Sequence, residues 1–128
     1  MTGFLLDSHV LLWLLSAPER LGTRCRADLE SAAQVRFSSA SIWELRIKAD
    51  LGKVTVPDGL AAAAVAAGLR ELPVTSAHVD ASAGFSLPHR DPFDRLLLGQ
   101  ADHERLALLT ADRTLLGAGL PFVRDAAR

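Results

Sequence analysis

Residues 4–15 read FLLDSHVLLWLL, and this stretch predicts the first strand, a polar turn and the first helix of the fold. Its apolar run, Phe4-Leu5-Leu6, is short and ends at Asp7, as a buried strand does. The apolar residues from Val10 to Leu15 then indicate a helix, which ends near Pro18. A buried strand that leads through a polar residue into a helix is typical of α/β proteins with a parallel sheet.

The same alternation of short apolar strands and helices continues along the chain. We expect strands at residues 35–38, 72–74, 106–110 and 122–123, helices at residues 24–33, 40–51, 57–69, 76–85, 91–105 and 112–116, and a loop at residues 87–90. This order predicts a single α/β domain over residues 1–128, with a short parallel sheet covered by helices on both faces. In such a sheet, binding sites form at the carboxyl ends of the strands.

The composition excludes several classes of protein. Cys25 is the only cysteine, which excludes an internal disulfide and a metal site built from thiolates. No apolar run approaches the roughly 20 residues that span a bilayer, and the N-terminus lacks the basic region of a secretory signal, so we expect a soluble cytoplasmic protein with no membrane contact. The net charge of −1 neither favours nor excludes a polyanionic partner, although twelve of the fourteen cationic residues are Arg, which suits phosphate contacts.

Two acids directly follow predicted strands and precede predicted helices. These are Asp7, after the first strand, and Asp112, after the strand at residues 106–110. An aspartate in this position is also a favourable N-cap, because its side chain accepts a backbone N–H of the first helical turn. Capping alone therefore explains either residue when it is considered singly.

Two further acids lie on helices. Asp94 occupies the first turn of the helix that Asp91 and Pro92 begin, and helical spacing places it in the apolar stripe of that helix. Burying an unpaired carboxylate is costly, so Asp94 needs a partner. Glu44 is spaced to pair with Lys48, and it falls beside an apparent apolar stripe of Ala40, Trp43, Ile47 and Leu51, which predicts that it is half buried.

If these four acids converge, each pair of carboxylates about 5 Å apart repels by about 3 kcal/mol at an effective dielectric constant of 20. Such a cluster must either take up protons or bind a cation. Ligands that are all oxygen atoms suit Mg²⁺ or Mn²⁺, and metals held in this way commonly serve phosphate chemistry.

Four stretches of the sequence resemble the PIN-domain ribonucleases and, among them, the VapC-type toxins of bacterial toxin–antitoxin pairs. They are residues 5–13, 38–53, 89–97 and 108–112, and they occur in the order found in that family. In the family an acid at each of four places forms a metal-binding pocket, and the sheet is parallel with helices on both sides. The resemblance therefore implies that Asp7, Glu44, Asp94 and Asp112 form the catalytic, metal-binding site.

The resemblance further implies a metal-dependent endoribonuclease that leaves a 5′-phosphate and a 3′-hydroxyl. One or two Mg²⁺ or Mn²⁺ ions are expected in the pocket. Asp7 and Asp94 are expected to be direct ligands, with Glu44 and Asp112 holding metal-bound water or a second ion. The accessory residues are expected to be Ser8, Thr110 and Asp91.

The partners expected from the resemblance are an RNA substrate, a cognate antitoxin whose tail lies across the active site, and a second copy of the chain in a homodimer. Candidate surfaces for protein partners are the apolar helices at residues 10–15 and 60–69. The cations expected near the pocket, to meet the RNA backbone, are Arg46, Lys48, Lys53, Arg90 and Arg95.

Three other functions are compatible with part of the pattern. A catalytically silent PIN-like module that binds RNA or protein is expected to lack one or more of the acids, and here all four are present. A receiver-type phosphoacceptor domain requires adjacent acids after the first strand and a lysine after the last, but Ser8 and Arg124 stand there. A nuclease that acts on DNA with the same metal chemistry is distinguished only by its substrate.

Overall fold

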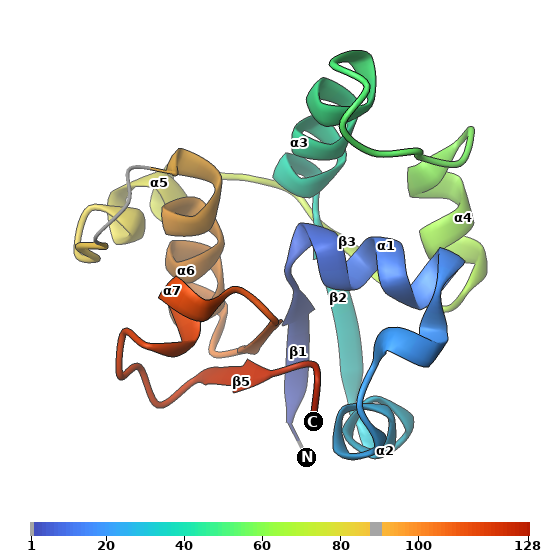
Figure 1. Cartoon of the computed structure of the whole chain (residues 1–128). Helices are drawn as coiled ribbons and strands as arrows, with labels where there is room; N and C mark the ends of the chain where they lie inside the picture. The colour runs from blue at the N-terminus through green and yellow to red at the C-terminus, as the bar shows by residue number, and fades with distance from the viewer. Residues whose placement is uncertain (1, 88–90) are drawn as a thin grey trace.

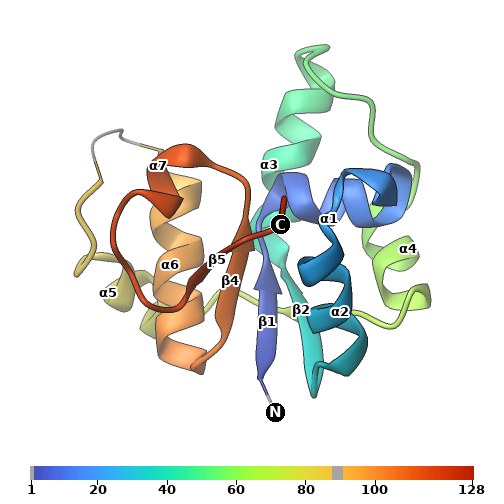
Figure 2. The same cartoon turned by 60° about the horizontal axis from the view of Figure 1, so that its bottom comes forward.

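The five strands form one parallel sheet in the order β3-β2-β1-β4-β5 (Figure 1, Figure 2). The structure is a computed structural model that describes residues 2–87 and 91–128. The strands are β1 (Gly3–Leu6), β2 (Gln34–Ser38), β3 (Arg70–Leu72), β4 (Ala107–Thr110) and β5 (Val123–Asp125). The predicted α/β fold class is confirmed, and the strand that opens the sequence is the centre of the sheet.

Helices cover both faces of the sheet. In Figure 1, α5, α6 and α7 lie on one side, α1, α2 and α4 on the other, and α3 extends beyond the end of the sheet. Within the described residues the helices are α1 (Ser8–Ser16), α2 (Thr23–Ser31), α3 (Ser39–Asp50), α4 (Leu60–Ala66), α5 (Ser76–Ser82), α6 (Pro92–Glu104) and α7 (Arg113–Leu116), with a 3₁₀ turn at Pro18–Arg20. None of these helices is both long and apolar enough to cross a membrane.

The alternation of side chains along the central strands divides the interior into two cores. Phe4 and Leu6 of β1 pack with α1 and α4, whereas Leu5 between them packs with α6 and α7. In β4, Leu109 belongs to the first core and Leu108 to the second. Since both faces of the sheet are buried, these strands appear in the sequence as continuous apolar runs.

The third strand and the helix before it differ from the prediction. The strand is Arg70–Leu72 rather than residues 72–74, and α4 ends at Ala66 rather than near residue 69. Gly68 has a φ of 94°, which turns the chain out of the helix and starts the strand early. Pro73 then ends the strand, because proline has no backbone N–H to donate. Residues 88–90 of the predicted loop lie outside the described residues.

Gly99 allows α6 to pack closely on α5, and we expect Gly99→Ala to destabilise the fold. A Cβ atom at this position would lie 2.6 Å from the carbonyl oxygen of His78 and 2.7 Å from the amide nitrogen of Ser82. Alanine improves helix propensity by about 1 kcal/mol, but this backbone overlap outweighs it, and we expect a net loss of about 2 kcal/mol.

Thermal unfolding followed by circular dichroism would measure this loss as a fall in Tm of about 5–10 °C. Gly84→Ala is the matched control, because its nearest contact would be an ordinary 3.5 Å. Equal Tm values for the two variants would show that the α5–α6 contact tolerates a methyl group.

Candidate metal centre

Two of the predicted acids lie between β1 and β4, where the strand order of the sheet reverses. The chain runs outward from β1 to β2 and β3 on one side of this point, and from β4 to β5 on the other. β1 lies between β2 and β4, and Asp7 and Asp112 follow β1 and β4 at their carboxyl ends. A crevice opens at this point in a parallel sheet, because the crossovers on its two sides cover different faces. Both acids also cap helices, Asp7 by accepting from the amide of Ser8 and Asp112 by accepting from the amides of Thr114 and Leu115.

A cavity of about 200 Å³ occupies this crevice, and we call it the acidic cavity. It brings together all four predicted acids, two from α3 and α6 and two that follow β1 and β4. Asp91 lies with them, so the lining has five acids, against Lys48 and His9 as its basic side chains. The full lining is Asp7, His9, Trp13, Glu44, Lys48, Asp91, Asp94, Ala111 and Asp112.

Asp7 is buried and held at both of its carboxylate oxygens. Oδ1 accepts from the amide of Ser8 at 2.6 Å, and Oδ2 accepts from the hydroxyl of Thr110 at 2.7 Å. The same hydroxyl oxygen accepts from the amide of Asp112 at 3.0 Å. Burial raises the pKa of Asp7 and the charge of Glu44 adds to the effect, while the bonds from Thr110 and Ser8 oppose it. Each oxygen keeps a further lone pair for a ligand.

Glu44 is buried rather than half buried, with 5% of its surface exposed. Its Oε1 accepts from the hydroxyl of Ser8 at 2.5 Å, and its Oε2 pairs with Lys48 Nζ at 2.8 Å. The predicted apolar stripe of α3 is confirmed at Ala40, which is buried, and in part at Ile47, which is half buried, but it is wrong at Trp43 and Leu51. Trp43 and Leu51 are each 64% exposed, because α3 turns the face with Ser41, Glu44 and Leu45 inward.

The cavity also disfavours the ionisation of Asp94. It is 6% exposed, and burial raises its pKa to about 8, with further contributions from the charges of Asp7, Asp91, Asp112 and Glu44. Asp91 caps α6 by accepting from the amide of Phe93 at 2.9 Å, as predicted. A cavity that raises the pKa of its acids in this way has a strong affinity for a positive charge.

The donors in this cavity suit a hard divalent cation. Carboxylate oxygens dominate the lining, and no cysteine belongs to it. Partial desolvation lowers the pKa of Lys48, but the hydrogen bond and charge of Glu44, with the charges of Asp91 and Asp7, raise it overall. Lys48 is therefore protonated at neutral pH and balances only part of the negative charge. The side chains fit Mg²⁺ or Mn²⁺ better than a softer ion.

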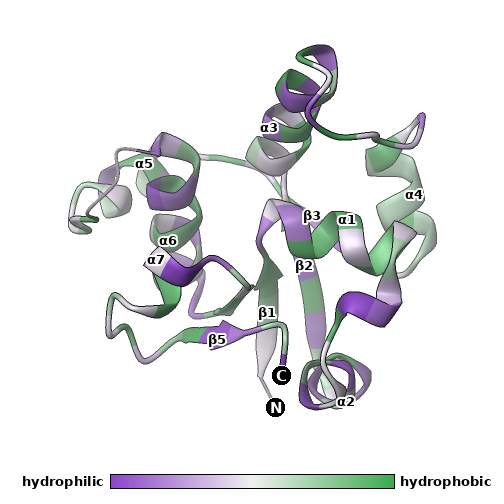
Figure 3. Cartoon of the chain, in the orientation of Figure 1, coloured by the Kyte–Doolittle hydropathy of each residue, from purple (hydrophilic) through white to green (hydrophobic). Residues whose placement is uncertain are grey.

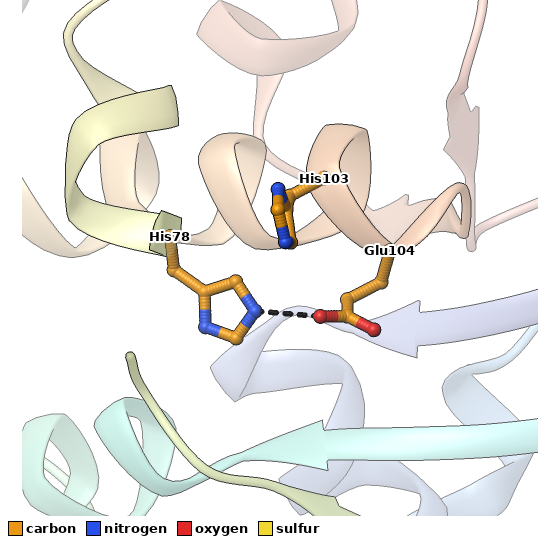
Figure 4. Close-up of side chains that lie close together, drawn as sticks. All are labelled: His78, His103 and Glu104. Atoms are coloured by element: carbon orange, nitrogen blue, oxygen red, sulfur yellow. Dashed lines mark hydrogen bonds and ion pairs between the residues drawn. The ribbon is translucent and has the colours of Figure 1, made fainter. Parts of the chain in front are cut away.

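A tighter group of possible ligands lies elsewhere in the described residues. His78 of α5 faces Glu104 of α6, with His103 beside them (Figure 4). His78 Nδ1 accepts from the amide of Thr75 at 3.0 Å, so the ring proton is on Nε2, which donates to Glu104 at 2.8 Å. A metal ion on Nε2 would require the ring to lose this proton while Nδ1 still faces a donor. The geometry favours a structural link between α5 and α6.

The predicted RNA-binding cations are placed differently from one another. Lys48 lines the acidic cavity, whereas Arg46, Lys53 and Arg95 are exposed and not among its lining residues. Arg90 lies outside the described residues. The predicted accessory residues Ser8 and Thr110 are buried and contact Glu44 and Asp7.

Three lining residues were not among the predicted site residues, Ala111 and two residues of α1. His9 and Trp13 of α1 both reach the acidic cavity. Their sequence positions could have indicated this. His9 lies two positions after Asp7, and Trp13 lies four residues further on, so both share the helix face nearest Asp7. The guanidinium of Arg20 lies 4.5 Å from the centre of the Trp13 ring and stabilises the position of this aromatic side chain.

Comparison with known proteins identifies the family of the chain. The PIN domain family matches residues 4–118, and the chain belongs to that family. Ribonuclease VapC22 of Mycobacterium tuberculosis is 30% identical over 120 residues, which cover 90% of this chain and 91% of the relative. Within the PIN family, the chain is therefore of the VapC type.

Solved structures share the whole fold. DNA-bound VapBC from Salmonella typhimurium matches with a TM-score of 0.65 and 21% identity, over 98% of each chain. A toxin–antitoxin complex from Klebsiella pneumoniae matches with a TM-score of 0.62 and 19% identity, over 94% of each chain. At these identities the likeness establishes the fold, and it agrees with the PIN-type architecture expected from the sequence.

Proposed function

We propose that the chain is a metal-dependent endoribonuclease and the toxin of a toxin–antitoxin pair. The observation that carries the proposal is the gathering of Asp7, Glu44, Asp94 and Asp112 in one cavity at the carboxyl ends of the central strands. The relationship to a protein named ribonuclease over 90% of the chain supports RNA rather than DNA as the substrate. We take residues 1–128 as one PIN-like nuclease domain that acts in the cytoplasm, where its RNA substrate lies.

We assign the catalytic, metal-binding role to the four acids. Asp7 and Asp94 would hold Mg²⁺ or Mn²⁺ directly, and Glu44 and Asp112 would hold water of the ion or a second ion. When bound, the metal would lower the pKa of a water and offset charge on the scissile phosphate. In the hydrolysis, the water oxygen forms a bond to phosphorus as the bond to the 3′-oxygen breaks, which leaves a 5′-phosphate and a 3′-hydroxyl.

The neighbouring side chains would set the position and charge of these acids. Thr110 and Ser8 fix both oxygens of Asp7, so that its remaining lone pairs keep one direction. Lys48 fixes the position of the Glu44 carboxylate through the 2.8 Å pair. Asp94 carries a proton at neutral pH when the cavity has no cation, because its pKa is about 8, and it would release that proton on metal binding.

The proposed protein partners are an antitoxin and a second copy of the chain. Toxin–antitoxin complexes among the solved structures with this fold support the first. The predicted surfaces on α1 and α4 are less exposed than the sequence suggests, since Val10, Leu11, Leu60 and Ala64 are buried in the core. Val65 on α4 stays 57% exposed and is available for contact.

The test is to express the wild type and Asp94→Asn separately in bacteria and to map 5′-phosphate ends across all cellular RNA. We expect discrete new ends with the wild type alone. Identical maps from two folded proteins, each free of any partner, would contradict the nuclease assignment and leave the RNA- or protein-binding module as the function.

Thr110→Val is expected to weaken metal binding about 10- to 100-fold without unfolding the protein. Valine has nearly the same shape as threonine, but it removes the hydroxyl that donates to Asp7 and accepts from the amide of Asp112. Calorimetric titration with Mn²⁺ measures the change. Thr110→Ser is the matched control, because it keeps the hydroxyl and should retain most of the affinity. Equal weakening by both variants would show that the hydroxyl does not position Asp7.

A further inference from the structure

A second cavity, of about 690 Å³, is bounded by α2, α7 and β5, and we call it the arginine cavity. Four arginines line it, Arg24 from α2, Arg113 from α7, Arg124 from β5 and Arg128, together with two acids, Asp28 and Asp125. Figure 3 shows strongly hydrophilic segments on these three elements. These residues belong to neither the acidic cavity nor the cations predicted from the sequence.

Three of the four arginines in this cavity form no ion pair with a described residue. Arg128 pairs with Asp125 at 3.7 Å, whereas the guanidinium groups of Arg24, Arg113 and Arg124 form no ion pair with any described residue. The Arg124 guanidinium lies 5.6 Å from the centre of the Phe4 ring, which fixes its position without neutralising it. Four cations that share a cavity with two acids repel one another, and a bound anion relieves that repulsion.

Consecutive residues just after β4 line the two cavities. Asp112 lines the acidic cavity and the next residue, Arg113, lines the arginine cavity. The hydroxyl of Thr110 points to Asp7, while its backbone pairs in register with Asp125 of the arginine cavity and accepts from the amide of Ala126. A nucleic-acid strand with one phosphate at the four acids must continue across a neighbouring surface. The arginine cavity offers such a surface, because its lining includes Arg113, the residue after Asp112.

We propose that the arginine cavity binds backbone phosphates of the RNA strand next to the scissile bond. The proposal rests on the function proposed above. Among the described residues that line the acidic cavity, Lys48 is the one Lys or Arg, and Glu44 already pairs with it, so flanking phosphates gain from cations elsewhere. Guanidinium groups bind phosphate oxygens in pairs. An acidic protein segment would also match the positive charge of the arginine cavity. Only an RNA substrate, however, must extend beyond the four acids and so requires a neighbouring binding surface.

The experiment compares two double variants that lose the same charge, each in an Asp94→Asn background that prevents cleavage. Arg24→Gln with Arg113→Gln removes two cavity cations, and Arg26→Gln with Arg70→Gln removes two exposed arginines outside it. The probe is a short fluorescein-labelled oligouridylate, titrated by fluorescence anisotropy at several salt concentrations. Circular dichroism checks that all the variants are folded. We expect them to be, because all four substituted arginines are exposed. Cleavage by the wild type is measured separately.

We expect the cavity variant to bind the RNA at least about tenfold more weakly at low salt. Its logarithmic salt slope should be smaller by about 1.4, because each of the two lost phosphate contacts on a single strand contributes about 0.7 to that slope. The control variant should bind within about threefold of the parent protein. Equal binding by the two variants would overturn the proposal, and would leave the nuclease function intact if the wild type still cleaves RNA. A second titration uses labelled oligoglutamate as the probe. If the cavity variant lost binding to oligoglutamate while its RNA binding stayed unchanged, the proposal would also be overturned, and a protein partner would be indicated.

Discussion

Asp7→Asn is expected to reduce RNA cleavage at least about 1,000-fold, which corresponds to roughly 4 kcal/mol of transition-state stabilisation. Asn keeps the size of the side chain and can still accept the 2.6 Å bond from the amide of Ser8. It removes the negative charge, however, and places an amide nitrogen or a neutral oxygen where Thr110 now donates to Oδ2. A cation at this position would lose its central anionic ligand.

The measurement is the initial rate of cleavage of a purified cellular RNA with Mg²⁺ or Mn²⁺, together with calorimetric titration of the metal alone. Asp50→Asn is the matched control, because it makes the same chemical change at an exposed position of α3. We expect that control to cleave at the wild-type rate. Undiminished cleavage by Asp7→Asn would remove Asp7 from the catalytic site and undermine the proposed ligand set.

Asp94→Asn is expected to stabilise the metal-free protein at pH 8, although the same change should abolish activity. The folded protein holds a proton on Asp94 up to a pKa of about 8, whereas the unfolded chain loses it near 3.8. Unfolding therefore releases a proton, and the stability that is fully present below the unfolded pKa is lost as the pH rises through the folded pKa. Asn has no such proton to lose.

We expect Asp94→Asn to gain on the order of 2 kcal/mol at pH 8, which raises Tm by about 5–10 °C, with the gain shrinking towards pH 4. Thermal unfolding in a chelator at a series of pH values measures it, and Asp102→Asn, exposed on the same helix, is the control. Excess Mn²⁺ should reverse the order, because only the wild type keeps the full ligand set. A Tm difference that does not vary with pH would show that Asp94 is ionised in the metal-free cavity.

The sequence predicted best where the responsible interactions are local. The caps at Asp7, Asp91 and Asp112 depend on amides one to three residues away, and each forms as expected. Strands buried on both faces were also predicted, because each appears as a short continuous apolar run that can be recognised without knowing which strand it pairs with. The early start of β3 depends on the left-handed turn at Gly68, and glycine permits such a turn without requiring it.

The orientation of α3 shows where sequence periodicity was not sufficient. Spacing alone predicted that Trp43 and Leu51 face inward, since apolar residues normally form the buried stripe of a helix. The structure instead turns Glu44 inward, where Ser8 and Lys48 satisfy both of its oxygens. Those partners offset the desolvation of the carboxylate, and Trp43 packs edge-on against Phe93 at the surface.

The sequence by itself determined the parallel α/β fold, the helix caps and the four acids, because these follow from residue type and spacing within a few positions along the chain. Only the tertiary structure decided which acids meet, which cations join them, and that a separate set of arginines shares a neighbouring cavity. The contact of Ser8 with Glu44 spans 36 positions and that of Thr110 with Asp7 spans 103, so each forms only when the strands pair and the helices pack. Local propensity carries no information about contacts at that separation, because they depend on the registry of the whole sheet.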